Sequence, residues 1–240
     1  WFSDFSLSHN REKIKELASG QLKDEANAWF VGEPFKVFYD YKKEGIWKLG
    51  EEAAAAANGQ EPGDIKVQDV DGNGVITTDD RIIYSQRPDV TFGFNNTFNY
   101  KGFDLSVFLY ARLGQWIAYD YNTTYRINAL ENGGNVDYWT PENPTNAFPC
   151  PNKSKSYTQV TYYSTLKYED GSFFKIRDIT LGYTFKPELL KHLNLSKLRV
   201  YATAKNFFTF SKIDNYDPEQ GGSISFPMTK QLVFGLNVEF

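Results

Sequence analysis

The sequence predicts an all-β fold, and more specifically part of a large antiparallel transmembrane β-barrel with long extracellular loops. Several segments alternate between apolar and polar residues, which gives a strand two unlike faces. The connections between them are short at one end and long at the other. The final strand stops on Phe240, at the end of a fully apolar row. In an outer-membrane barrel such a row faces lipid and the opposite row faces a wet lumen.

Seven segments read as strands because they alternate with a period of two. They are Trp1–Ser8, Phe35–Tyr41, Thr91–Tyr100, Phe103–Arg112, Ser172–Phe185, Leu198–Phe210 and Lys230–Phe240. In the last segment the apolar row is Leu232, Phe234, Leu236, Val238 and Phe240. Charged residues such as Asp104, Arg199 and Lys205 stand in the opposite rows of their strands, which suits a hydrated lumen.

The connections favour a barrel over a sandwich. The link Tyr100–Gly102 is very short and Lys186–Lys197 is modest, whereas Lys42–Val90, Leu113–Gly171 and Ser211–Thr229 are long. A compact sandwich rarely carries several long loops without structure of their own. With the C-terminus on the periplasmic side, the long loops are expected to be extracellular and Arg11–Pro34 periplasmic. A short helix is expected at Glu51–Ala57.

About seven strands cannot close around a transport-sized lumen, and an open sheet in a membrane would expose backbone groups to lipid. We therefore expect residues 1–240 to be the C-terminal portion of a barrel whose N-terminal strands lie upstream.

The composition and the missing motifs argue against nucleic-acid binding and against catalysis. The net charge of −4 argues against a nucleic-acid-binding surface, which would be basic. Cys150 is the only cysteine, so no internal disulfide can form. The sequence has no Gly-rich phosphate loop, nucleophile elbow or Cys/His metal cluster, and we therefore expect no catalytic residues and no enzyme.

One motif carries recognisable chemistry. Residues 69–80 fit an EF-hand-like calcium loop, with Gly74 at the sixth position, where the chain turns sharply. The expected Ca²⁺ ligands are Asp69, Asp71, Asn73, the backbone carbonyl of Val75, and Asp80. Asp80 stands where the motif has a glutamate, which makes bidentate ligation less assured. The alternative is an Asp/Asn/Gly-rich turn that binds no ion; a bound ion would pin an extracellular loop.

Several phrases of the sequence resemble the C-terminal part of SusC/RagA-type TonB-dependent transporters. They are Pro62–Ile76, Asp80–Arg81, Phe92–Phe108, Tyr138–Asn146, Phe174–Tyr183, Leu198–Phe207, Tyr216–Glu219 and the ending in Phe240. The resemblance implies a 22-stranded outer-membrane barrel with an N-terminal plug. It also implies energy from TonB and a SusD-like surface lipoprotein over the extracellular mouth. Phe240 would be the signal read by the barrel-assembly machinery. The plug, the TonB-binding region and the N-terminal strands are absent from these residues.

The function that this resemblance implies is import of oligosaccharides or peptides, as the barrel component of a SusCD-like complex. We expect location in the outer membrane of a Gram-negative bacterium. The expected partners are lipid, the SusD-like lipoprotein, TonB through the missing region, the N-terminal remainder of the transporter, and a glycan or peptide substrate, but no nucleic acid. The alternative is a secreted, calcium-stabilised β-sandwich that binds carbohydrate.

Overall fold

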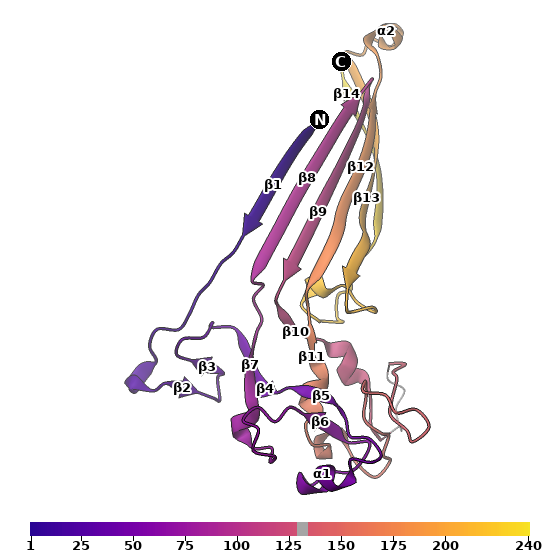
Figure 1. Cartoon of the computed structure of the whole chain (residues 1–240). Coiled ribbons are helices and arrows are strands. Elements are labelled where there is room, and N and C mark those ends of the chain that lie inside the picture. The colour runs from indigo at the N-terminus through magenta and orange to yellow at the C-terminus, as the bar shows by residue number, and fades with distance from the viewer. Residues whose placement is uncertain (129–133) are drawn as a thin grey trace.

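A computed structural model, which describes residues 1–128 and 134–240, is dominated by one antiparallel sheet of six long strands (Figure 1). Its strands, in spatial order, are β1 (Phe2–Ser8), β8 (Val90–Tyr100), β9 (Phe103–Leu113), β12 (Phe173–Thr184), β13 (Lys197–Ser211) and β14 (Gln231–Glu239). The sheet does not close on itself, because β1 and β14 are its two edges. The all-β prediction is confirmed, and the sheet has the form of a barrel-wall segment.

Both termini and the two short connections lie at one end of the sheet, which we call the turn end (Figure 1). The β8–β9 turn has positive φ at Lys101 and Gly102, as a two-residue hairpin of type I′ requires. The β12–β13 connection contains α2 (Pro187–Leu190) and the 3-10 helix η6 (Lys191–Leu193).

Three long connections lie at the opposite, loop end, and they contain structure of their own (Figure 1). Their two-stranded pairings are β2 (Lys23–Asp24) with β3 (Trp29–Phe30), β4 (Val37–Tyr41) with β7 (Arg81–Ser85), β5 (Lys43–Ile46) with β6 (Ile65–Val67), and β10 (Trp116–Ala118) with β11 (Tyr168–Asp170). Their helical turns are η1 (Ala18–Gly20), α1 (Glu52–Ala57), η2 (Thr78–Asp80), η3 (Asp120–Thr124), η4 (Tyr157–Gln159), η5 (Tyr163–Lys167) and η7 (Pro218–Gln220). The helix expected at Glu51–Ala57 is α1.

The long loops therefore differ from the structureless segments that the sequence suggested. They share a buried cluster built from residues 46–67 and residues 125–166, which come from two different loops. Its members are Ile46, Ile65, Val67, Tyr125, Ile127, Trp139, Val160 and Leu166. Burial of these side chains fixes the two loops to each other, since apolar burial is the main favourable term in folding. Residues 129–133, within the second loop, lie outside the described residues.

Two expectations about topology are wrong. Phe35–Tyr41 was expected in the barrel wall, but β4 pairs with β7 among the loops. Because β1 pairs directly with β8, residues 9–89 form a single long connection at the loop end. Arg11–Pro34 therefore lies at the loop end with the other long connections, and not at the turn end.

The outer face of the sheet is apolar along continuous rows. Leu105 lies opposite Leu181, Leu181 opposite Ala202, and Ala202 opposite Phe234, so all four share one face. Leu181 and Phe234 are 52% and 77% exposed. A β-sandwich would bury this face against a second sheet. The exposed apolar row therefore argues against the β-sandwich. Within the described residues no helix is long and apolar enough to cross a membrane.

A β-bulge preserves this outer face. The register of β12 shifts between Ile176 and Asp178 against both neighbouring strands. Phe174 and Ile176 lie on the outer face before the shift, opposite Ala111 and Leu109, and Ile179 and Leu181 lie on it after the shift. The extra residue changes the outward-facing positions from even-numbered to odd-numbered ones along the chain.

Candidate functional site

The predicted calcium loop folds as a compact turn between β6 and β7. Gly72 and Gly74 have φ of 73° and 84°, values that glycine adopts without steric cost. The Asp69 carboxylate accepts the backbone N–H groups of Gly72 and Gly74 at 2.8 and 2.7 Å. Asp80 is fully buried and accepts backbone N–H groups of Val70 and Thr77 at 2.8 and 2.7 Å. These hydrogen bonds, that from Thr77 most of all, hold the pKa of Asp80 below its usual value.

Three of the predicted ligands converge. Carboxylate oxygens of Asp69, Asp71 and Asp80 lie within 4.8 Å of one another. Asn73 adjoins them, since its side chain donates to Asp71 Oδ2 at 2.7 Å. Val75 follows in the same turn, and its backbone N–H donates to Asn73 Oδ1 at 2.8 Å. The donor set is all oxygen and the loop contains no lysine or arginine, so the residues fit a hard cation such as Ca²⁺.

The inner face of the sheet carries charged and hydroxyl side chains in register. Lys205 Nζ pairs with Asp178 Oδ1 at 3.0 Å, and the hydroxyls of Thr180 and Thr203 lie 2.9 Å apart. Arg199 reaches past β12 to Asp104 on β9 and forms two hydrogen bonds, at 2.9 and 2.5 Å. The inner face is thus lined by polar groups, as the sequence predicts for a wet lumen.

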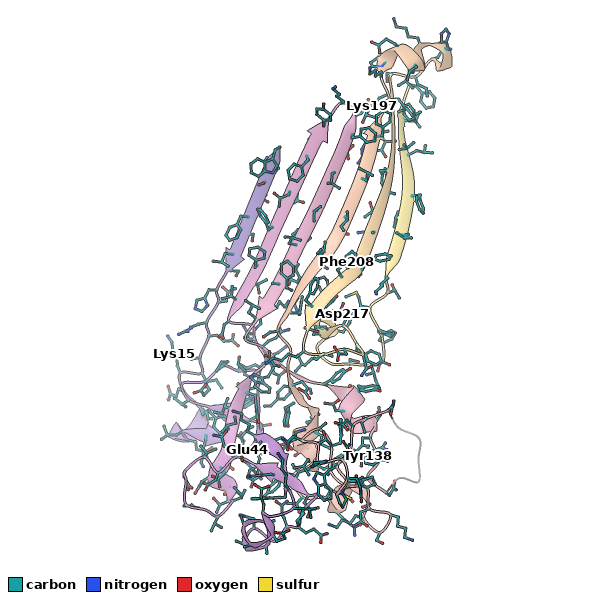
Figure 2. All side chains as sticks on the ribbon, turned by 45° about the vertical axis from the view of Figure 1, so that its right-hand side comes forward. Lys15, Glu44, Tyr138, Lys197, Phe208 and Asp217 are labelled. Carbon is teal, nitrogen blue, oxygen red and sulfur yellow. The ribbon has the colours of Figure 1, made fainter. Side chains whose placement is uncertain are left out.

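A buried lysine fixes the last loop against the inner face. Lys175 is fully buried on β12, and its Nζ lies 2.6 Å from Asp217 Oδ2 and 2.8 Å from Glu219 Oε2. Arg177 Nη1 also contacts Glu219 Oε1, at 3.1 Å, so two cations meet two anions. Thr209 donates to Asp217 Oδ2 at 3.2 Å. Asp217 lies where the sheet meets the loops (Figure 2). We call Lys175, Arg177, Asp217 and Glu219 the loop latch.

The same loop contacts the 113–171 loop through aromatic side chains. Tyr216 contacts Tyr119 and Tyr121, at ring-centroid distances of 6.5 and 5.9 Å. Ile117 and Ile213 complete this small buried cluster. The backbone N–H of Asp120 donates to Gly222 O at 3.0 Å. Residues 213–222 therefore link the inner wall of the sheet to the loop-end body.

A cavity of about 240 Å³ lies between residues 42–84 of the first long loop and residues 116–170 of the second, and its lining includes Lys43 and Glu169. Asn122 donates to Glu169 Oε1 at 2.9 Å, and burial raises the pKa of Glu169. Lys43 Nζ donates to the Ala147 carbonyl at 2.5 Å, and burial lowers its pKa. The cavity walls also carry Tyr84, Trp116 and Tyr168. Aromatic rings beside hydrogen-bonding groups form a surface that can hold a polar organic ligand.

Sequence reasoning missed the loop latch. A lysine inside the apolar run of 173–176 was the available signal, because a buried lysine requires a partner. Its partners could not be identified, since Asp217 and Glu219 are two acids among 30. Phe240, the expected assembly signal, is 94% exposed at the turn end, and its backbone oxygen accepts from Ser196 Oγ at 3.4 Å.

Comparison with known proteins gives a consistent set of relatives, although no protein-family model matches the chain. Over its whole length the chain is 29% and 30% identical to TonB-dependent receptors P3 and P26 of Formosa agariphila, and covers 27% of each. It is 27% identical to the TonB-dependent receptor SusC of Bacteroides thetaiotaomicron and covers 24% of it. The chain thus spans about a quarter of the length of these relatives. They are receptors, which agrees with the prediction that the protein is not an enzyme.

Solved structures give the same fold. The structure of the RagAB peptide transporter superposes with a TM-score of 0.74 and 24% identity, over 99% of this chain and 27% of that chain. The RagAB peptide importer in the open-open state gives a TM-score of 0.68 and 25% identity, over 99% and 26% of the two chains.

Proposed function

Because the chain belongs with the SusC/RagA-type TonB-dependent receptors, we propose that it forms part of the barrel of an outer-membrane importer of oligosaccharides or peptides. The observation that carries the proposal is the two-faced sheet. Its outer row of Leu105, Leu181 and Phe234 is apolar. Its inner face carries ion pairs and paired hydroxyl groups. With the outer face against lipid, the turn end is periplasmic and the loop end extracellular.

The proposal also concerns partners. A SusD-like lipoprotein would cover the loop end, where two loops share one buried core and present a broad folded surface. TonB would supply energy through the part of the receptor that precedes these residues. Co-purification of a surface lipoprotein with the full-length receptor would support the first of these partners, and its absence after gentle extraction would contradict it.

Uptake by cells tests the function directly. Cells that produce the full-length receptor should take up labelled oligosaccharides or peptides too large for porins, and uptake should stop when TonB is deleted. A matched strain without the receptor is the control. Equal uptake in the two strains, or uptake that does not depend on TonB, would contradict the proposal.

We further propose that residues 69–80 bind Ca²⁺ as a structural ion. The side chains of Asp69, Asp71, Asn73 and Asp80, with the carbonyl of Val75, would hold it, and the ion would screen three converging carboxylates. Calorimetry should show binding heat with the wild-type receptor and none with Asp71→Ala. Asp79→Ala, which changes an acid outside the predicted ligand set, is the control. Negligible heat for the wild type would overturn the calcium site.

A further inference from the structure

The hairpin formed by β2 and β3 has an apolar face that is largely uncovered. Asp24 lies opposite Trp29 in this hairpin, and the backbone N–H of Val31 donates to the carbonyl of Leu22 at 2.9 Å. These two pairs are two residues apart along each strand, so Leu22, Trp29 and Val31 lie on one face. The ring of Phe35 adjoins that of Trp29, at a centroid distance of 5.7 Å. We call Leu22, Trp29 and Phe35 the hairpin patch.

The two faces of the hairpin have different surroundings. On the opposite face Phe30 is buried, and its ring centroid lies 4.7 Å from that of Tyr39 on β4. In the hairpin patch, by contrast, Leu22 is 77% exposed and Phe35 is 52% exposed. Strands of two residues each form a hairpin that is marginally stable in water by itself. An apolar face on such a hairpin therefore indicates a packing partner beyond the described residues.

The neighbouring edge of the sheet indicates which partner this is. Strand β1 pairs with β8 on one side, and its other side is a free edge of the described sheet. Inside a membrane the backbone groups of that edge require a paired strand. Because β1 runs from the turn end to the loop end (Figure 1), an antiparallel neighbour that joins it through a short turn begins at the loop end. The loop before that neighbour then lies beside residues 9–35, which leave β1 at the same end.

The hairpin lies on the matching side of the molecule. In Figure 1, β2 and β3 are at the β1 side of the loop end, away from β10 and β11. Lys15, in the same segment, is on this side in Figure 2 as well. A cavity of about 540 Å³ at the base of the segment, lined by residues 10–13, 32–34 and 83–89, leaves further room beside the end of β1.

We propose that the hairpin patch docks the extracellular loop immediately upstream of the strand that pairs with β1. This contact would join the first long loop of the described residues to the preceding loop of the same receptor, much as a shared core joins two loops among residues 46–166. The inference rests on the proposed function, in which these residues form the C-terminal part of a longer barrel.

Lipid is a poorer partner for the hairpin than a folded loop. The hairpin carries Lys23, Asp24 and Glu25, and Lys23 Nζ pairs with Glu25 Oε1 at 2.6 Å, with both side chains exposed. Moving these charges into hydrocarbon is costly. A folded loop can cover the hairpin patch and leave the charges in water.

Photo-crosslinking in the full-length receptor tests the contact. The photoreactive residue p-benzoylphenylalanine would replace Leu22 or Phe35, the receptor would be irradiated in intact outer membranes, and the crosslinked peptides would be identified by mass spectrometry. Both positions should crosslink to residues upstream of β1 in the same chain. Leu49, which is 60% exposed beside α1, is the control position and should give no crosslink to that upstream loop.

Hydrogen exchange gives a second measurement that does not depend on crosslinking chemistry. The double variant Leu22→Ser, Phe35→Ser removes two apolar side chains from the contact, so amides of the upstream loop should exchange about tenfold faster. Leu49→Ser, Phe226→Ser is the matched control, because it removes the same two side chains from exposed positions elsewhere at the loop end. The amides of β1 and β8 should exchange at the wild-type rate in both variants.

Four results would overturn the inference. They are crosslinks from positions 22 and 35 to a different protein, crosslinks to lipid, crosslinks only within residues 36–240, or wild-type exchange of the upstream loop in Leu22→Ser, Phe35→Ser. Crosslinks to the upstream loop in a receptor that imports nothing would support the contact and contradict the proposed function. Import by a receptor whose positions 22 and 35 crosslink only to a surface lipoprotein would contradict the contact alone.

Discussion

Arg199 and Asp104 form an ion pair across a strand that separates them. Asp104 is on β9, opposite Gly182 of β12, and Arg199 is on β13, opposite Thr184 of the same strand. A Cβ atom at Gly182 would lie 2.5 Å from Arg199 Nη2 and 2.6 Å from Asp104 Oδ1. The pair therefore depends on the missing side chain, and it ties three strands together at the turn end.

Gly182→Ala should separate this pair and destabilise the barrel by about 1–2 kcal/mol, because the added methyl displaces two hydrogen-bonded groups that are only about one-fifth exposed. The urea concentration at which the full-length barrel loses its folded electrophoretic mobility measures the effect. Gly93→Ala is the control, since its Cβ would meet its nearest atom at 3.6 Å. Equal midpoints for the two variants would contradict the role given to Gly182.

Lys175→Met should release the last loop from the inner wall. It leaves Asp217 and Glu219 without their buried cation, and breaking a buried pair in this way costs about 3–5 kcal/mol. Protease treatment of intact cells should then cut within residues 212–230, which the wild type resists. Lys205→Met removes a cation from a half-exposed pair and should leave the loop protected. A protected loop in Lys175→Met would show that the latch does not hold it.

The calcium loop should respond to pH through Asp80. Hydrogen bonds from backbone N–H groups lower the pKa of Asp80 in the folded state, so its stabilising contribution is present above the usual value of 3.8. That contribution is lost as the pH falls through the lowered pKa. Asp80→Asn should therefore reduce hydrogen-exchange protection of residues 69–80 at pH 7, with chelator present, and the difference from wild type should shrink in acid. Asp79→Asn is the control, and a difference that grows in acid would contradict the assignment.

Deletion of Phe240 should lower the amount of assembled receptor. The side chain is almost fully exposed at the turn end, so its loss should cost little packing within the sheet. A reduced level would then reflect recognition during assembly. Immunoblots of folded and unfolded receptor in outer membranes measure the effect, and Phe240→Tyr is the matched control. Unchanged levels after deletion would count against an assembly signal.

Sequence periodicity predicted the six long strands because each has one apolar and one polar face. It could not place Phe35–Tyr41, since Val37, Tyr39 and Tyr41 alternate as a barrel strand would. Only the partner distinguishes the two cases, and Arg81–Ser85 is that partner. Misplacing this one strand also moved Arg11–Pro34 to the wrong end. A period of two identifies a strand and its faces, but not the strand beside it.

The bulge in β12 set a second limit on prediction. An unbroken alternation from Ile179 and Leu181 would place Lys175 on the outer, lipid-facing row. The register shift at Arg177 turns Lys175 inward instead, where Asp217 and Glu219 meet it. For the calcium loop, by contrast, spacing sufficed to predict that Asp69, Asp71 and Asp80 would converge. Such a loop is local in sequence, whereas the latch joins residues more than 40 positions apart.

The two-faced sheet is the central claim, and spin labels along β14 test it most directly. Cysteines would be placed singly from Leu232 to Asn237 in a full-length receptor carrying Cys150→Ser, reconstituted in bilayers, and labelled. Collision rates with oxygen, which concentrates in lipid, and with a water-soluble nickel chelate would be measured at each position. Labels at 232, 234 and 236 should meet oxygen preferentially, and labels at 233, 235 and 237 the nickel chelate. Nickel access at all six positions, or no alternation between them, would contradict a lipid-facing outer row.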